Sequence, residues 1–251
     1  MNERALQAYV GDDSVVRYHP GDRQTLLLTC EHAGNQLPTA FGPLSDEERG
    51  VIDDHWGWDI GAFGLSMVLA QTLSVPLVSA ELSRLVCDLN RPLDAPDLHR
   101  QDCEGVKMSF NVGLSEASLR EREEIHRVFH EFTQDRIQEA KPGYLISIHS
   151  FTPVWNNAPR EVEVGILYNR YESTAKRLKA GLESLGVSAH LNAPYSGFED
   201  GVYSIERHGQ AANLPYLELE IRQDLIREQE GQEHWGALLS GLLSADLFID
   251  T

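Results

Sequence analysis

The chain has few cysteines and few basic residues, and it has no long apolar run. Its three cysteines form no CxxC pair, which argues against a disulfide framework and against a cysteine-rich zinc site. Lys+Arg number 21 against 39 Asp+Glu, and no basic run offers a surface that could neutralise nucleic-acid phosphates. No stretch approaches the ~18 apolar residues of a membrane span, and the charged N-terminal segment lacks the apolar core of a signal peptide. We therefore expect a cytoplasmic protein that binds neither nucleic acid nor membrane.

Several common active-site motifs are also absent. The sequence has no GxGxxG, no P-loop and no GxSxG, which disfavours nucleotide-binding and serine-hydrolase functions. The segment HRVFH places His126 and His130 one helical turn apart, but it lacks the glutamate of an HExxH motif. Because its neighbours are heavily charged, we interpret this segment as a solvated helix face. We expect Cys30 to have a packing role, since no helix N-terminus is predicted to lower the pKa of its thiol.

Short apolar runs alternate with helical patterns along the chain. The runs that predict strands span residues 24–30, 75–80, 144–150, 162–168, 187–191 and 214–221. The patterns that predict helices span residues 45–54, 61–73, 115–140, 171–185 and 229–246. This alternation predicts one α/β domain with a mixed, largely parallel sheet that is covered on both faces. Three loops rich in Pro, Gly and Asn are long enough to be binding loops or lids, over residues 91–114, 151–161 and 192–203.

Metal-capable side chains follow two of the predicted strands. In TCEHAG, His32 comes directly after the first strand, and in SIHS, His149 lies at the end of the third. Because an open α/β sheet brings the carboxyl ends of its strands together, the two imidazoles could meet. Asp59, in DDHWGWDIGA, could complete the three protein ligands that a catalytic zinc commonly uses. His55 and Glu31 compete with Asp59 for the metal, and helix capping is another role open to Asp59.

The last predicted strand, LPYLELEIR, combines apolar and charged residues. Strand alternation places Glu218, Glu220 and Arg222 on the face opposite the leucines. Buried charges need partners, and a cleft with a metal would supply them, so we predict Glu220 as the general base. An edge strand with a solvated face is the alternative. His208, in ERHG, is a candidate for lining the pocket or binding an oxyanion, with a surface position as the alternative.

Arginines cluster near the same predicted strand ends. Arg84, Arg91 and Arg222 fall there, and Asn90 precedes Arg91. The planar guanidinium fork suits bidentate binding of a carboxylate. The pattern therefore predicts a small substrate that carries one or two carboxylates, with ordinary ion pairing to the many acidic residues as the alternative.

Six motifs, in order along residues 24 to 245 or so, resemble the N-formylglutamate amidohydrolase family: CEHAGNQLP, DDHWGWDIGA, SRLVCDLNRP, SIHSFTP, NAPYSG and ELEIRQDL. The resemblance implies one domain over residues 1–251, with residues 1–22 as an N-terminal extension. It implies a three-layer α/β/α fold like that of zinc exopeptidases. It further implies hydrolysis of N-formyl-L-glutamate to formate and glutamate in histidine degradation, with zinc as the cofactor.

Wider relatives of that family imply roles for single residues. His32 and His149 resemble the zinc histidines of cell-wall amidases, and Asp59 falls where those enzymes carry a glutamate ligand. This departure leaves His55 or Glu31 open as the second ligand. Glu220 resembles the last-strand catalytic glutamate of zinc carboxypeptidases and aspartoacylases.

The pair Asn90 and Arg91 resembles the Asn-Arg pair by which the carboxypeptidases and aspartoacylases hold a substrate carboxylate. The sequence thus predicts a metal-dependent amidohydrolase for a small N-acylated acidic amino acid, with N-formylglutamate as the leading candidate. One alternative is an amidase for another N-acyl amino acid or a formylated peptide. The other is a non-catalytic protein that binds a carboxylate ligand on the same scaffold. The sequence leaves the oligomeric state open.

Overall fold

The computed structural model describes residues 15–38, 41, 43–199, 201–243 and 247. Seven of the strands form one sheet in the order β1-β3-β2-β6-β11-β9-β10. Their bounds are Val16–His19 (β1), Leu26–Cys30 (β2), Leu77–Ala80 (β3), Tyr144–Phe151 (β6), Val164–Leu167 (β9), Ala189–Leu191 (β10) and Tyr216–Arg222 (β11). The strands β3, β2, β6 and β11 run parallel to one another, whereas β1 and β9 pair antiparallel with β3 and β11. The sheet is therefore mixed and largely parallel, as predicted.

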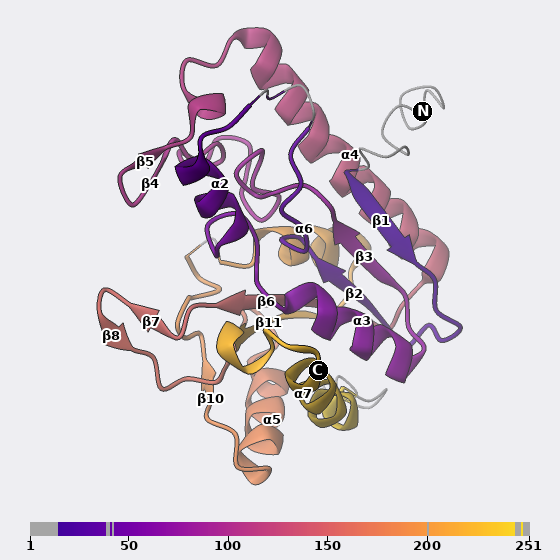
Figure 1. The fold of residues 1–251 in the computed structure, drawn as a ribbon. Helices are drawn as coiled ribbons and strands as arrows, with labels where there is room; N and C mark the ends of the chain where they lie inside the picture. Colours follow the sequence, from indigo (N-terminus) through magenta and orange to yellow (C-terminus); the bar gives the residue numbers. More distant parts are fainter. Residues whose placement is uncertain (1–14, 39–40, 42, 200, 244–246, 248–251) are drawn as a thin grey trace.

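Helices cover both faces of this sheet (Figure 1). One face packs against α3 (Ala62–Leu73), α5 (Glu172–Ser184) and α7 (Gln229–Leu242). The other packs against α4 (Glu116–Ala140) and α6 (Tyr203–Ala212). The short helix α2 (Asp46–Asp53) begins at a capping box and closes a smaller apolar cluster beside the sheet. The three-layer α/β/α prediction is confirmed.

Burial on both faces explains why the strands read as continuous apolar runs. In β2, Leu26 and Leu28 pack into the core under α3, while Leu27 packs into the core under α4. Every residue of β2 and β3 is buried. Parallel strands covered by helices on each side have this composition, because neither face meets water. The six predicted strands and five predicted helices are all present, with bounds shifted by a few residues; residues 244–246 of the predicted last helix lie outside the described residues.

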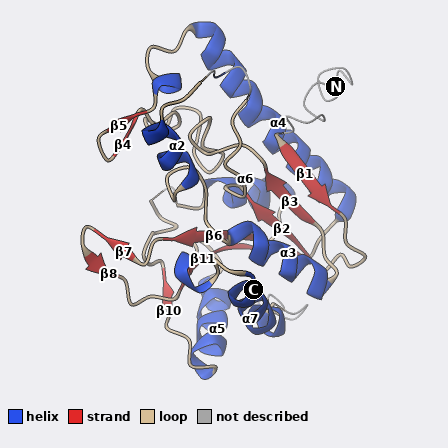
Figure 2. Cartoon of the chain, viewed as in Figure 1, coloured by secondary structure: helices blue, strands red, loops and turns tan. Residues whose placement is uncertain are grey.

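The structure also contains elements that the sequence analysis missed. Strand β1 lies within the predicted N-terminal extension, residues 1–22, and pairs with β3 at the edge of the sheet. Helix α6 follows the predicted loop 192–203. Two hairpins, β4–β5 (Asp102–Cys103 and Val106–Lys107) and β7–β8 (Val154–Trp155 and Ala158–Pro159), occupy the predicted loops 91–114 and 151–161 (Figure 2). Among the described residues, no helix is both long and apolar enough to cross a bilayer.

The parallel strands β3, β2, β6 and β11 end at the same edge of the sheet, and the chain leaves that edge in tight turns. At Gly34, just after β2, a Cβ atom would lie 2.1 Å from the backbone oxygen of Glu81. Any larger residue would have to push the segment after β2 away from the segment after β3. The glycine therefore fixes the position of both segments, including His32.

We expect Gly34→Ala to lower the free energy of unfolding by about 1–3 kcal/mol, because backbone at this distance cannot yield as a flexible side chain would. Gly50→Ala is the matched control: Gly50 is exposed in α2, and its Cβ would meet nothing within 4 Å. That change should be neutral or stabilising by up to about 1 kcal/mol. Urea unfolding of both variants measures the difference, and equal stabilities would contradict the close approach at Gly34.

Candidate active site

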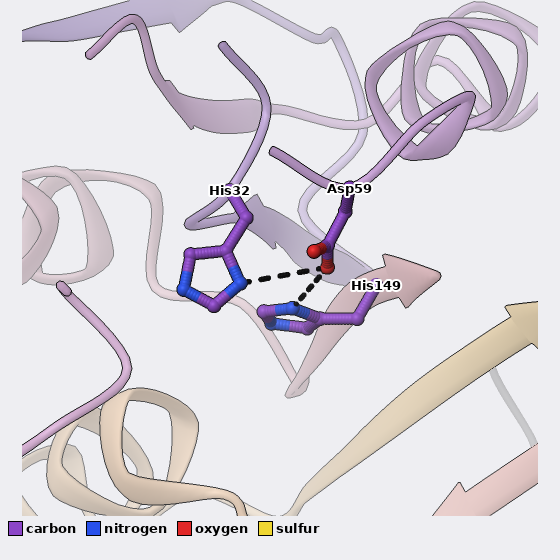
Figure 3. A group of neighbouring side chains, drawn as sticks. All are labelled: His32, Asp59 and His149. Carbon is purple, nitrogen blue, oxygen red and sulfur yellow. Dashed lines mark hydrogen bonds and ion pairs between the residues drawn. The ribbon is translucent and has the colours of Figure 1, made fainter. Parts of the chain in front are cut away.

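Three side chains from separate segments converge at the polar edge of the sheet (Figure 3). His32 follows β2, Asp59 precedes α3, and His149 lies in β6. The Asp59 Oδ2 atom is 2.8 Å from His149 Nδ1 and 3.5 Å from His32 Nδ1. All three residues are buried, and each offers one ligand atom within 4.8 Å of the others. The structure thus brings together the three predicted ligands, with Asp59 between the two imidazoles.

The outer nitrogen of each imidazole meets a further carboxylate. His32 Nε2 lies 2.7 Å from Asp88 Oδ1, and His149 Nε2 lies 3.1 Å from Glu31 Oε2. A carboxylate in this position accepts the Nε2 proton and leaves the Nδ1 lone pair for a metal. His32 Nδ1 is indeed buried without a hydrogen-bond partner. Glu31 therefore lies behind His149, outside the group of three converging ligand atoms.

Glu31 is held in its ionised form by several donors. Its carboxylate accepts hydrogen bonds from Ser147 on β6 and from Ser204 on α6. Burial alone would raise the pKa of Glu31, but the hydrogen bonds from His149 and the two serines outweigh it and lower the pKa to about 2. Likewise, burial opposes the charge of Asp59, but the adjacent His32 and His149 hold its pKa well below the usual range.

Glu218 and Glu220 project from β11 on the side of the sheet that carries this cluster. Glu220 pairs in register with His149 on β6, and its Oε2 atom is buried without a partner. Burial, reinforced by the negative charge of Asp59, raises the pKa of Glu220 to about 7. Burial and the nearby Glu220 raise the pKa of Glu218 to about 8. Because β11 lies between β6 and β9, the alternative of a solvated edge strand is wrong.

The donor set and its charge fit a divalent cation. Five buried carboxyl groups surround the site: Glu31, Asp59, Asp88, Glu218 and Glu220. The basic side chains beside them are one arginine and two imidazoles: Arg84, His32 and His149. Buried carboxyl groups are costly to ionise together, as the raised pKa values of Glu218 and Glu220 reflect, and a bound cation would stabilise their ionised forms. Two imidazole nitrogens and one carboxylate oxygen form a common ligand set for zinc. In the part of the chain that the structure describes, two buried groups bring three possible ligand atoms together: His32, Asp59 and His149, and His149, Glu218 and Glu220. The first group carries two imidazoles and one carboxylate, so it fits zinc better. His55 lines the adjoining cavity but is not one of the converging ligands.

The cluster forms one wall of a cavity of about 460 Å3. Arg84, Asn90 and Arg91, the predicted substrate-binding residues, are among those that line it. The guanidinium of Arg84 pairs with Asp88 at 2.6 Å and lies 3.5 Å from Asp59. Arg100, which the sequence analysis did not single out, also lines the cavity.

Arg222 and His208 are not among the residues that line the cavity. Arg222 pairs with Asp224 and donates to the backbone oxygen of Arg160. His208 is buried in α6, where its Nε2 lies 3.0 Å from His130 Nδ1. The structure therefore places neither side chain where it could touch a substrate in this cavity.

The interpretation of residues 126–130 as a solvated face is wrong. His126 and His130 are both buried in α4, with ring centroids 4.3 Å apart, and His126 Nε2 contacts the backbone oxygen of Arg91 at 3.0 Å. The charged neighbours Glu123, Arg127 and Glu131 are exposed, whereas the histidines contact α6 and the segment after β3. Their partners lie far away in the sequence, so no local pattern reveals their burial.

Besides Arg100, three acidic residues contribute to the site in ways that the sequence did not reveal: Asp88, Glu31 and Glu218. Asp88 lies in the quoted motif SRLVCDLNRP, two residues before Asn90. Asp88 is an acidic residue beside the apolar run LVC, and this was the feature of the sequence that could have pointed to a buried role. Asn90 joins the same network, because its amide donates to Glu218 and its Oδ1 accepts from the backbone of Ser204.

The position of His208 leads to a prediction. His208→Phe keeps the ring volume but leaves His130 and Gln134 without their buried partner, so we expect the free energy of unfolding to fall by about 1–3 kcal/mol. Turnover should stay within about threefold, because His208 is buried outside the cavity. Urea unfolding and steady-state kinetics measure the two effects. A hundredfold loss of turnover at unchanged stability would show that His208 takes part in the reaction.

Known proteins resemble the chain along most of its length. The family described as N-formylglutamate amidohydrolase matches residues 24–227. An N-formylglutamate deformylase from Pseudomonas putida is 28% identical over 243 residues, which is 86% of each chain. The crystal structure of a gene product from Agrobacterium tumefaciens shares 30% identity with a TM-score of 0.84, over 91% of this chain and 93% of that one.

A second solved structure shares the fold at lower identity. The N-formylglutamate amidohydrolase from Ralstonia eutropha superposes with a TM-score of 0.72 at 18% identity, over 91% of this chain and 95% of that one. The family match covers far more than half of the chain and includes every residue of the cluster described above. The chain therefore belongs to the N-formylglutamate amidohydrolase family and is a hydrolase of non-peptide amides.

Proposed function

We propose that this protein hydrolyses N-formyl-L-glutamate to formate and L-glutamate with the help of a bound divalent metal, most simply zinc. The observation that carries the proposal is the convergence of His32 Nδ1, Asp59 Oδ2 and His149 Nδ1 beside the unpartnered carboxyl oxygen of Glu220. The family description and the deformylase from Pseudomonas putida support the choice of substrate.

His32, Asp59 and His149 would hold the metal, while Asp88 and Glu31 orient the two imidazoles from behind. When bound, zinc would supply Lewis acidity and lower the pKa of water toward ~7. The positive charge of the metal would then balance the excess of carboxylates. The fold provides these ligands on strand ends and short turns, so they are in place before substrate arrives.

Glu220 moves the proton. Its carboxylate accepts a proton from the attacking water and then delivers that proton to the departing nitrogen of glutamate. Burial, reinforced by the charge of Asp59, raises its pKa, so Glu220 is a stronger base than an exposed glutamate. Glu218, which is hydrogen-bonded to Asn90, adjoins Glu220 and keeps the two carboxylates from ionising independently.

The arginines of the cavity divide into two groups. Arg84 lies against Asp59 and Asp88, so its guanidinium is the one placed to stabilise the oxyanion that develops on the amide oxygen. This is the role for which His208 was also a candidate. Arg91 and Arg100 lie on either side of Asp97 and would bind the substrate carboxylates. Asn90 positions this segment against α6.

Glu220→Gln tests the assignment of the general base. The change removes the proton acceptor but keeps the shape of the side chain, so kcat should fall by about 10²–10⁴-fold. Binding of N-formyl-L-glutamate, measured by calorimetry on the metal-loaded variant, should stay within about threefold. Near-normal turnover would show that another group takes the proton.

Metal content and affinity test the ligand set. We expect about one divalent metal per chain, loss of activity on chelation, and recovery with zinc, cobalt or manganese. Asp88→Asn should weaken zinc binding by about 10–100-fold, because the partner of His32 Nε2 is weakened. Competition with a chromophoric chelator measures the affinity without reference to activity.

Asp97→Asn is the matched control for Asp88→Asn. Asp97 lines the same cavity, but it pairs with Arg91 and Arg100 instead of a histidine, so zinc affinity should not change. A metal content under ~0.1 ion per chain, together with no gain in activity on adding zinc, cobalt or manganese, would overturn the proposal of metal-dependent hydrolysis.

A further inference from the structure

One part of the cavity is lined by aromatic side chains that the proposed reaction does not use. Trp56, Phe151, Trp155 and Tyr195 all line it. The rings of Trp56 and Trp155 lie 6.2 Å apart, which spans the gap between the segment after α2 and the hairpin β7–β8. The ring of Trp56 also lies 5.2 Å from the guanidinium of Arg100, so Trp56 borders the arginines. We call the other three residues, Phe151, Trp155 and Tyr195, the aromatic wall.

The aromatic wall is held rigid but remains open to a ligand. The guanidinium of Arg160 lies 5.4 Å from the ring centres of Phe151, Trp155 and Tyr195, and it donates to Thr152. Trp155 and Tyr195 nevertheless stay 41% and 42% exposed. Fixed aromatic faces that remain open to solvent beside a cavity are typical of a site for an apolar group.

The cavity is larger than N-formylglutamate requires. Cavities of about 300–1,000 Å3 hold drug-sized ligands, whereas N-formylglutamate has only about 12 non-hydrogen atoms. The cavity here measures about 460 Å3. A formyl group carries only hydrogen on its carbonyl carbon, so with this substrate nothing would extend from the scissile bond to the aromatic wall.

The order of strands places the aromatic wall on the acyl side of the scissile bond. Arg84, Asn90 and Arg91 belong to the segment after β3, whereas Phe151 and Trp155 continue from β6, and Tyr195 follows β10. In the sheet, β3 and β10 lie on opposite sides of β2 and β6, whose ends carry the histidines. When the carboxylates of a substrate lie on the arginines and its amide lies at the histidines, the acyl substituent points toward the aromatic wall.

We propose that the aromatic wall is an acyl-binding subsite, and that this enzyme hydrolyses N-acylated acidic amino acids whose acyl group carries an aromatic ring. Water adds across the amide C–N bond; the acyl carbon leaves as a carboxylate and the nitrogen leaves as the free amine of the amino acid. The inference rests on the proposed function for its catalytic groups and carboxylate clamp, and it widens the range of acyl groups beyond formyl.

A matched pair of substrates tests the subsite. N-phenylacetyl-L-glutamate and N-acetyl-L-glutamate have amides of similar intrinsic reactivity, and they differ by one phenyl ring. Release of glutamate is followed for both, and for N-formyl-L-glutamate, with the metal-loaded enzyme. We expect kcat/KM for the phenylacetyl substrate to exceed that for the acetyl substrate at least tenfold, a difference that one well-placed aromatic contact supplies.

Trp155→Ala removes one face of the subsite. It should lower the ratio of the two kcat/KM values about tenfold, and Trp155 lies in a short exposed hairpin where truncation does not disturb the core. Phe198→Ala is the matched control, because Phe198 is also an exposed aromatic residue near Tyr195 but does not line the cavity. This variant should keep the ratio of the wild-type protein. Calorimetric affinities of both substrates for Glu220→Gln give the same comparison without turnover.

The outcomes separate this inference from the proposed function. Turnover of N-formyl-L-glutamate without preference for phenylacetyl over acetyl would overturn the acyl subsite and leave the proposed function intact. A preference for phenylacetyl that is lost in Trp155→Ala, without turnover of the formyl substrate, would support the subsite and overturn the formyl assignment. Failure of the metal-loaded enzyme to release glutamate from all three substrates would overturn both.

Discussion

The carboxylate of Asp59, buried between the imidazoles of His32 and His149, is the interaction on which the rest of the site depends. None of the three side chains can be buried alone, because an isolated charge in a protein interior costs several kcal/mol. Each is stabilised by the next, and the chain of contacts continues outward to Asp88 and Glu31. The three side chains are almost fully buried although they line the cavity, so their geometry is set mainly by contacts within the protein.

The same network explains features of the fold that look unrelated to catalysis. Ser204 on α6 donates to Glu31 with its hydroxyl and to Asn90 with its backbone N–H. Helix α6 is thereby joined to the turns after β2 and β3. His126 fixes the backbone of Arg91 from α4. The layer formed by α4 and α6 is therefore built around the polar strand ends, and a change in either helix would be transmitted to the site through these contacts.

The sequence predicted what depends on local pattern and missed what depends on distant partners. The apolar runs before His32 and His149 identified two central strands, and the parallel sheet then brought those histidines together. Family membership confirmed the kind of enzyme. The burial of His130 and His208 could not be predicted, because the two residues are 78 positions apart and each lies in a helix rich in polar residues. Arg222 ends β11, where its charge pairs with Asp224, and it is not among the residues that line the cavity.

The proposed catalytic groups and the aromatic wall lie on different kinds of structural element. Family membership therefore indicates the type of reaction more firmly than the identity of the substrate. The groups that would bind metal and move protons lie on strands or in the tight turns beside them, where backbone hydrogen bonds hold their positions. The aromatic wall lies mostly on a hairpin and a loop, which vary in sequence at little cost to the core. Substitutions around Trp155 and Tyr195 would therefore leave the positions of His32, His149 and Glu220 unchanged. In this chain those positions hold aromatic rings that pack against Arg160, and the proposed acyl subsite would select the acyl group there.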